Sequence, residues 1–323
     1  MRAQPEFEHY PIEIKAPDIS AFSPGNTGIP YAYTHDSGVT GPHVMINALT
    51  HGNEYCGAMA VKELLELKLR PRRGKLTLSF ANYQAYQNFD PEQPDASRFV
   101  DRDFNRVWKE ALLDDLSQDC VELRRAREMR PLIDSVDLLL DVHSMHERSD
   151  ALLLSGALDK GISLAKKIAM PRHIIVDAGH AEGRRLRDYA GFGNPDSNKN
   201  ALLVECGQHW ETSAAQMARH CIYRFLHAAK CIEPDDLPAL WQVAPSAEVL
   251  VIKVTDAVVA DSMDFRFAED YRGMEVFESA GAEFAQRNGV TLTTPYDDCV
   301  MVMPSLRQLR PGVTVVRLGQ LIR

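Results

Sequence analysis

The chain has 323 residues, enough for one large hydrophobic core or for one core plus a smaller domain. Hydrophobic residues make up 45% of the chain and charged residues 25%, as in ordinary soluble globular proteins. The formal net charge of −9 argues against general binding to nucleic acid or to anionic membranes, although a local group of arginines could still bind an anionic small molecule.

The N-terminal stretch and the cysteines point to the cytoplasm. The stretch MRAQPEFEHYPIEIKAP lacks the apolar core of a signal peptide. No apolar run approaches the ~18 residues of a membrane span. The six cysteines are scattered and form no CxxC pair, so we interpret them as reduced thiols and not as a disulfide framework. We therefore expect a cytoplasmic protein without membrane contact.

The first strong strand pattern is the apolar run 43–49, which follows weaker alternations of edge-strand type within residues 1–40. The run breaks at residues 50–54, and apolar residues then recur at helical spacing over about 54–69. This order predicts a strand, a loop and a helix. Loops at the carboxyl ends of strands in an open α/β sheet are where ligands bind.

His51 and Glu54 lie three residues apart in this loop, so an imidazole and a carboxylate could converge on one metal ion. Gly52 between them would allow a backbone conformation that other residues resist. A zinc site also needs a third protein ligand and an open position for water. The alternative is an exposed turn with a hydrogen-bonded histidine and a solvated glutamate.

A long polar segment, 83–110, follows a predicted strand at 75–82. A loop of this length in a compact domain is usually functional or disordered, and its six aromatic residues argue against disorder. The segment carries three arginines and an asparagine, namely Arg98, Arg102, Asn105 and Arg106. Such a group suits recognition of a carboxylate and of a developing oxyanion, because arginine binds a carboxylate through two parallel hydrogen bonds. The alternative is local ion pairing with Asp101 and Asp103.

The third strong strand is predicted at 136–144, after a helix at about 119–130 that Pro131 would close. His143 ends this apolar strand in the same kind of position as His51, which makes it the best candidate for the third metal ligand. Asp141, two residues earlier on the same side of the strand, could orient the imidazole or the neighbouring loop.

His143 has competing interpretations. It could simply cap the end of the strand. His146 and Glu147 are rival ligands, but they lie beyond the strand end, where solvated side chains are expected.

The remaining elements predict an α/β fold followed by a β-rich segment. Strand patterns occur at 151–156, 173–179 and 201–208, helix patterns at 160–170 and 211–232, and a polar loop at 180–200. Strands alternating with helices predict a mostly parallel or mixed central sheet with helices on both faces. Short β-rich runs after residue 238 predict a catalytic domain at 1–238 and a small antiparallel β domain at 239–323.

Glu205 lies at the end of the apolar strand pattern 201–208. A carboxylate in such a place is costly unless it is used. Beside a zinc-bound water it would act as the general base, and later as the acid that protonates the leaving amine. Cys206 could suggest a nucleophile instead, but the sequence offers it no matched base, so we interpret it as a buried structural thiol.

Together these motifs resemble the succinylglutamate desuccinylase/aspartoacylase family of the zinc carboxypeptidase clan. The resemblance rests on His51-Gly-Asn-Glu54, Asp141-Val-His143-Ser144 and Val204-Glu205-Cys-Gly-Gln208, with Arg98 and Asn105-Arg106 between the first two. It covers about residues 40–230 by motif, and the C-terminal part by organisation only. It implies a carboxypeptidase-like fold and one Zn²⁺ per chain bound by His51, Glu54 and His143. It further implies that Glu205 is the base, that Arg98 polarises the scissile carbonyl, and that Asn105 and Arg106 hold a substrate carboxylate.

The implied enzyme is a zinc metallohydrolase that cleaves the amide bond of a small-molecule N-acyl amino acid, with Glu205 activating a zinc-bound water. The 180–200 loop contains unranked candidates for acyl recognition, namely Arg184, Arg185, Arg187 and Tyr189. Two alternatives stay open: a zinc carboxypeptidase acting on short peptides, and a non-catalytic small-molecule-binding protein on the same fold. A homo-oligomer is only a general expectation for a soluble protein.

Overall fold

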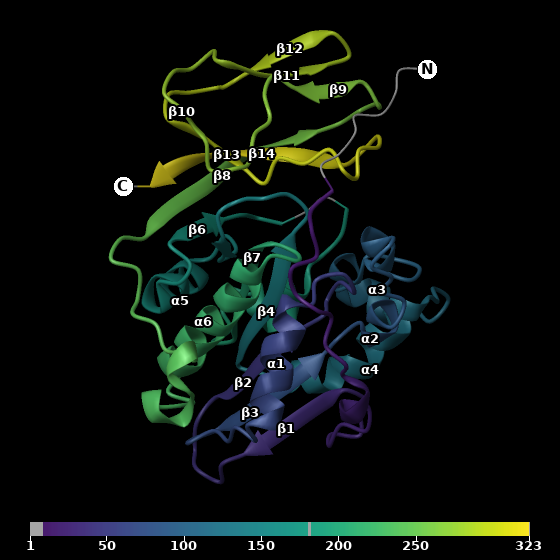
Figure 1. The fold of residues 1–323 in the computed structure, drawn as a ribbon, viewed down its shortest axis with the longest axis vertical. Helices are drawn as coiled ribbons and strands as arrows, with labels where there is room; N and C mark the ends of the chain where they lie inside the picture. The colour runs from purple at the N-terminus through teal and green to yellow at the C-terminus, as the bar shows by residue number, and fades with distance from the viewer. Residues whose placement is uncertain (1–8, 180–181, 323) are drawn as a thin grey trace.

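Eleven strands form one central sheet in the computed structural model, which describes residues 9–179 and 182–322 (Figure 1). Its order is β1-β3-β2-β4-β7-β5-β6-β8-β14-β13-β10. The strands of the first part are β1 (Ala32–Asp36), β2 (His43–Ala48), β3 (Lys75–Phe80), β4 (Leu138–Met145), β5 (Leu152–Leu154), β6 (His173–Val176) and β7 (Asn200–Gln208). The predicted central strands are therefore confirmed, as is one of the weak N-terminal patterns, which forms the edge strand β1.

The centre of the sheet is parallel and the whole sheet is mixed. Strands β3, β2, β4 and β7 run parallel to one another, whereas β1 is antiparallel to β3 and β5 is antiparallel to β7. All residues of β2 and β7 are buried, as expected for strands covered on both faces. The predicted α/β class is confirmed.

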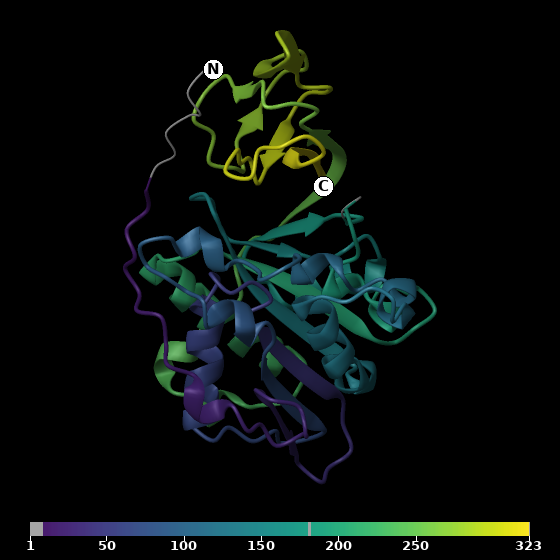
Figure 2. The ribbon, with the colours of Figure 1, turned by 90° about the vertical axis from the view of Figure 1, so that its right-hand side faces the viewer.

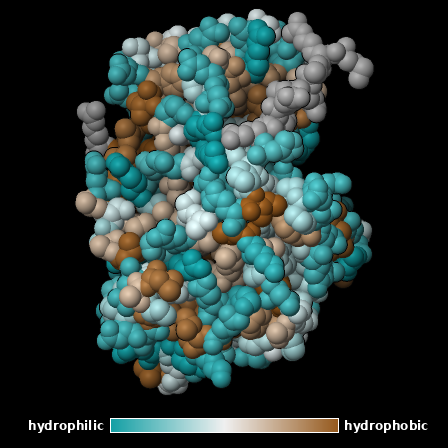
Figure 3. Space-filling view, in the orientation of Figure 1, coloured by the Kyte–Doolittle hydropathy of each residue, from teal (hydrophilic) through white to brown (hydrophobic). Residues whose placement is uncertain are grey.

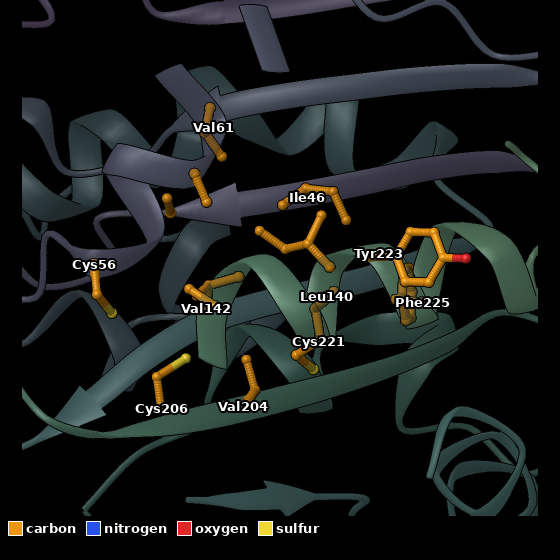
Figure 4. Packing of buried hydrophobic residues seen from close by; sticks show 14 of the residues in the cluster. Ile46, Cys56, Val61, Leu140, Val142, Val204, Cys206, Cys221, Tyr223 and Phe225 are labelled. Atoms are coloured by element: carbon orange, nitrogen blue, oxygen red, sulfur yellow. The ribbon is translucent and has the colours of Figure 1, made fainter. Parts of the chain in front are cut away.

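Successive residues of a strand point to opposite faces of the sheet, so the apolar strands present hydrophobic side chains on both faces. Helices cover both of these faces. Ile46, Leu140 and Val204 pack in one hydrophobic cluster with α1 and α6 (Figure 4). Met45 and Leu139 pack on the other face with α4. The helices are α1 (Cys56–Glu66), α2 (Tyr83–Tyr86), α3 (Glu110–Asp114), α4 (Val121–Ser135), α5 (Asp159–Ile168) and α6 (Thr212–Ala228).

The prediction that Pro131 closes a helix is wrong, because α4 continues to Ser135 with Pro131 inside it. Proline lacks one backbone N–H and so removes one intrahelical hydrogen bond. Met129 and Ile133 are buried on one face to either side of it, and their packing in the core holds the last turn in place. The segment 83–110 is irregular as predicted, with α2 and two short 3-10 turns, Pro94–Ser97 and Phe104–Arg106.

The C-terminal strands extend the central sheet and add a second one. They are β8 (Leu250–Val259), β9 (Phe265–Phe267), β10 (Val276–Phe277), β11 (Glu283–Arg287), β12 (Val290–Thr293), β13 (Cys299–Val302) and β14 (Thr314–Ile322). Strand β8 pairs in parallel with β6 and antiparallel with β14, while β12-β11-β9 form a separate antiparallel sheet. These strands gather at one end of the molecule, and β8 leads from the α/β layers into them (Figure 2). The domain division at residue 238 stays a prediction.

All six cysteines are free, which agrees with the expected reduced thiols. Within the described residues, no helix combines the length and the apolar character that crossing a bilayer requires. On the face shown in Figure 3, hydrophobic residues form small groups among hydrophilic ones.

Candidate active site

The candidate site lies at the carboxyl ends of β2, β4 and β7. His51 follows the end of β2, His143 lies near the end of β4, and Glu205 lies in β7. His143 and Glu205 are register partners across the β4–β7 pairing, so their side chains leave the sheet on the same side. Three elements far apart in sequence therefore bring these groups to one edge of the sheet.

The three predicted metal ligands converge. The Nδ1 atom of His51 lies 2.8 Å from Oε1 of Glu54, and Nδ1 of His143 lies 2.9 Å from Oε2 of the same carboxylate. All three side chains are buried. Burial alone would raise the pKa of Glu54, but the two imidazoles lower it well below its usual value. One ionised carboxylate thus faces two imidazole nitrogens.

Asp141 and Asp103 contact the ring nitrogens of His143 and His51 that point away from Glu54. Oδ2 of Asp141 lies 2.8 Å from Nε2 of His143, while its Oδ1 accepts a 2.7 Å hydrogen bond from the Thr50 hydroxyl. Asp141 therefore orients both the imidazole and the loop that carries His51. Oδ1 of Asp103 lies 3.0 Å from Nε2 of His51. We interpreted Asp103 from sequence only as an ion-pair partner, which it also is, through Arg98.

The loop of His51 needs Gly52 for space and not for conformation. A Cβ on Gly52 would lie 2.2 Å from the Ser97 carbonyl oxygen and 2.6 Å from the Tyr86 amide nitrogen. Gly52 is not among the residues with positive φ, whereas Leu49 has a φ of 57°. The expectation of an unusual conformation at Gly52 was therefore wrong. Close approach to the 83–110 segment excludes a larger side chain there.

This donor set fits zinc. Two imidazoles and one carboxylate are a common ligand set of catalytic zinc, and carboxylates behind the imidazoles are the usual outer partners. Glu205 adds an independent sign, because its buried Oε2 has no hydrogen-bond partner within residues 9–179 and 182–322. A buried polar atom without a partner is costly unless a ligand or water meets it.

Glu205 borders the cleft with only 8% of its surface exposed. Burial raises its pKa well above the usual value, and the charge of Glu54 acts in the same direction. A carboxylate with a raised pKa holds a proton more readily, which suits a group that must accept a proton and return it. Burial also raises the pKa of Cys206 well above its usual value, which keeps that thiol protonated and argues against a nucleophilic role.

Arg98 lies within the site. Its Nη1 donates a 2.9 Å hydrogen bond to Oε1 of Glu54, and its Nη2 lies 3.1 Å from Nε2 of His51. Its carbonyl oxygen accepts the N–H of Gly52 at 3.0 Å, which ties this segment to the loop of the predicted metal ligands. Its guanidinium lines the cleft beside His143.

Asn105 and Arg106 also line the cleft, next to Arg98. Oδ1 of Asn105 accepts the N–H of Leu186 at 2.9 Å, which leaves the amide nitrogen as the group that can donate to a ligand. Nη1 of Arg106 donates to the carbonyl oxygen of Asn105 at 2.9 Å, and its Nε lies 3.8 Å from Oε2 of Glu182. The predicted site residues other than Glu54 thus line one cleft, and Glu54 contacts both His51 and His143 behind it.

The 180–200 loop contributes one of its four candidates to the cleft. Arg185 is buried, lines the cleft and pairs with Asp177 at 2.9 Å. Arg184 pairs with Glu110 away from the cleft, Arg187 donates to the backbone of Ser155 and Ala201, and Tyr189 donates to Asp134. Residues 180 and 181 lie outside the described part of the chain.

The sequence interpretation missed the C-terminal side of the cleft. Ser305, Gln308 and Arg317 line the cleft together with the predicted ligands His51 and His143. Nε of Arg317, on β14, lies 3.5 Å from Oδ2 of Asp177. No sequence signal marked these residues, because the return of β14 to the cleft depends on strand pairing between distant segments.

A second polar cluster, also missed, lies beside the first. It comprises Asp95, His146 and His209. Burial, together with His146, lowers the pKa of His209 well below its usual value. Burial would raise the pKa of Asp95, but the hydrogen bond and charge of His146 lower it to about 2. His146, a rival ligand in the sequence interpretation, thus belongs to a different group, while Glu147 contacts Arg307 at 3.0 Å.

Comparison with known proteins extends these observations. A family model described as the succinylglutamate desuccinylase/aspartoacylase catalytic domain matches residues 40–223, more than half of the chain. A search of curated proteins finds no match.

Solved structures show the same fold. The chain is similar to a succinylglutamate desuccinylase/aspartoacylase from Rhodobacter sphaeroides, with a TM-score of 0.63 and 18% identity over 88% of this chain and 87% of that one. It is similar to the succinylglutamate desuccinylase from Chromobacterium violaceum, with a TM-score of 0.64 and 15% identity over 91% and 89%. It is also similar to the product-bound ectoine utilization protein EutE (DoeB) from Ruegeria pomeroyi, with a TM-score of 0.60 and 16% identity over 87% and 85%.

Proposed function

Because the chain belongs to the succinylglutamate desuccinylase/aspartoacylase family, we propose that it hydrolyses the amide bond of an N-acyl amino acid in a zinc-dependent reaction. One observation carries the proposal: His51, Glu54 and His143 converge on the cleft that also holds Glu205, whose Oε2 has no partner in the described structure. His51, Glu54 and His143 would hold the zinc ion. When bound, zinc supplies a Lewis acid that polarises a carbonyl oxygen and makes water more acidic.

Glu205 moves the protons in this reaction. Its carboxylate takes a proton from the attacking water as the new carbon–oxygen bond forms at the amide carbon. The same carboxyl group then gives the proton to the nitrogen of the leaving amino acid as the carbon–nitrogen bond breaks. Its raised pKa suits both steps, because the group must exist in both protonation states during one turnover.

Arg98 stabilises the negative charge that develops on the amide oxygen. Its guanidinium is already held in position by Glu54 and Asp103, so little reorganisation is needed when charge develops. A hydrogen-bond donor of this kind contributes roughly 3–4 kcal/mol to transition-state stabilisation.

Asn105 and Arg106 bind the carboxylate of the substrate. The amide nitrogen of Asn105 and the guanidinium of Arg106 are adjacent donors on the cleft wall. Paired donors favour a planar carboxylate over a neutral group.

The C-terminal wall of the cleft supports a small substrate over a peptide. Ser305, Gln308 and Arg317 add a wall to the cleft that His51 and His143 line, and we propose that this wall narrows the cleft. A carboxypeptidase needs room for several residues on one side of the scissile bond. This consideration favours the N-acyl amino acid.

A substrate panel tests the proposal. The zinc-loaded chain should release amino acid from one or more of the N-acetyl, N-succinyl and related N-acyl amino acids, and a chelator should abolish the release. Short peptides should be cleaved poorly. Faster cleavage of peptides would favour the carboxypeptidase alternative. Zinc-loaded protein that binds these compounds without turnover would indicate a binding protein.

A further inference from the structure

Asp95, His146 and His209 lie outside the first set of ligands and offer three ligand atoms within 4.8 Å of one another. Nδ1 of His146 lies 3.3 Å from Nε2 of His209 and 3.4 Å from Oδ1 of Asp95. Both separations exceed the ~2.9–3.0 Å that is most common for N–H hydrogen bonds. They match the ~3.3–3.4 Å edge of a tetrahedron whose corners lie ~2.0–2.1 Å from its centre, as zinc ligands do.

Each imidazole of this cluster is oriented through its other nitrogen. Nδ1 of His209 lies 2.9 Å from the Ser144 hydroxyl, and Nε2 of His146 lies 3.0 Å from the side-chain amide of Gln308. Each ring thus turns one nitrogen to an outer partner and the other into the cluster. This division is typical of metal-binding histidines, whose second nitrogen is held by a neighbouring polar group.

The backbone holds the two histidines side by side. His146 directly follows β4 and His209 directly follows β7, and the last paired residues of those strands, Met145 and Gln208, are register partners. The N–H of His209 donates to the carbonyl oxygen of Met145 at 3.0 Å. The positions of both rings are therefore set by the central sheet, and Asp95 approaches from the 3-10 turn Pro94–Ser97.

Asp101, Cys120 and Glu122 form another group that could hold a metal ion, and they differ from the cluster of Asp95, His146 and His209. The carboxylate oxygens of Glu122 accept the backbone N–H groups of Val100, Asp101 and Arg102. That carboxylate already caps a turn and is engaged by protein donors. Among the described residues, no backbone N–H donates to the atoms of Asp95, His146 and His209 that face one another, and the side-chain amide of Asn53 lies 3.5 Å from Oδ1 of Asp95.

We propose that Asp95, His146 and His209 form a second site for a divalent metal ion, for which zinc is the expected occupant. Two imidazoles and a carboxylate are a zinc ligand set, and a fourth position is left for water or for a substrate group. Asp95 and His146 line a surface depression, so this position is open to solvent. His146 also lines the cleft of His51 and His143, so the second ion lies beside the first site.

Metal counting tests the second site. The chain is stripped of metal, saturated with zinc and freed of excess, and zinc per chain is measured by mass spectrometry of the digested protein. The parent should hold two zinc ions. Asp95→Asn and His146→Gln should each hold one, and His143→Ala should keep the second. Glu92→Gln removes an exposed carboxylate from the same segment as Asp95 and should hold two.

Asp95 is on the surface, so Asp95→Asn should fold like the parent, and its melting temperature checks this. A parent chain that saturates at one zinc ion, which His143→Ala loses and Asp95→Asn keeps, overturns the second site. So does a second ion that survives either Asp95→Asn or His146→Gln. Hydrolysis of N-acyl amino acids is assayed on the same preparations. Two zinc ions without hydrolysis would count against the proposed function and not against this site.

Discussion

His143 and Glu205 occupy opposite positions on the adjacent parallel strands β4 and β7. The register of one strand pair therefore sets the separation between a predicted metal ligand and the predicted general base. A slip of one residue would turn one of the two side chains to the other face of the sheet. Since both strands are buried along most of their length, the hydrophobic packing that holds the sheet also holds this pair.

Replacing Glu205 by glutamine should abolish turnover and preserve metal binding. Glutamine keeps the size but cannot accept the proton from water, so kcat should fall by at least ~10²–10⁴. KM should change little, because Arg98, Asn105 and Arg106 remain. Zinc content and kcat are measured on one preparation. Glu66→Gln, at an exposed carboxylate of α1 that pairs with Lys62, is the control and should keep kcat near that of the parent. A zinc-replete and fully active Glu205→Gln chain would end the proposed mechanism.

The same substitution should stabilise the metal-free protein above acidic pH. The folded-state pKa of Glu205 is raised, so its ionisation favours the unfolded chain as the pH rises from the ordinary value of the group towards the raised one. Glutamine cannot ionise, so Glu205→Gln should melt higher than the parent at pH 8, with a smaller difference at pH 5. Thermal unfolding in the presence of a chelator measures both. A lower melting temperature for Glu205→Gln at pH 8 would show instead that the carboxylate is structural.

Arg106→Ala should weaken binding of substrates that carry a free carboxylate. A bidentate ion pair is lost, so KM should rise strongly for such a substrate and much less for the matched amide-capped one. The comparison requires steady-state kinetics with both substrates. Arg184→Ala removes an arginine that pairs with Glu110 away from the cleft, and it should leave both KM values unchanged. Equal damage to the two substrates would remove Arg106 from this role.

Asp141→Asn should reduce zinc affinity although Asp141 is not a ligand. The carboxylate positions His143 through one oxygen and Thr50 through the other, and loss of such a partner typically lowers metal affinity by ~10–100-fold. Competition with a zinc-binding dye measures the change. Asp137→Asn, at the start of β4 where the side chain accepts the N–H of His43, is the control and should keep the parent affinity. An unchanged affinity in Asp141→Asn would mean that packing alone orients His143.

The sequence predicted the structure correctly where a local pattern determines the positions of strands and of the residues at their ends. Long apolar runs predicted β2, β4 and β7, and a polar residue at the end of such a run has to lie at the edge of the sheet, which placed His51, His143 and Glu205 together. The prediction failed where the outcome depended on packing between distant segments. Pro131 does not end α4 because the buried residues on either side of it keep the helix in place.

The residues that were not predicted from the sequence fall into two kinds. His209 lies four positions after Glu205, just past the end of β7, and the rule that selected His143 could have selected it too. Asp95 and Gln308 carry no local signal, because a loop and a C-terminal segment bring them to His146 only in the folded chain. Gly52 was expected to adopt an unusual backbone conformation, whereas the neighbouring backbone in fact leaves no room for a side chain at this position.

The groups proposed to carry out hydrolysis come from residues 51–205, whereas one wall of the cleft comes from residues 302–317, joined through β8 and β14 to the same sheet. One wall of the cleft is therefore encoded in a stretch of sequence separate from the groups proposed for the chemistry. The connection between β13 and β14 contains no predicted zinc ligand, so it can be varied without replacing His51, Glu54 or His143. Libraries that vary this connection alone would test whether it sets the acyl preference of the proposed enzyme.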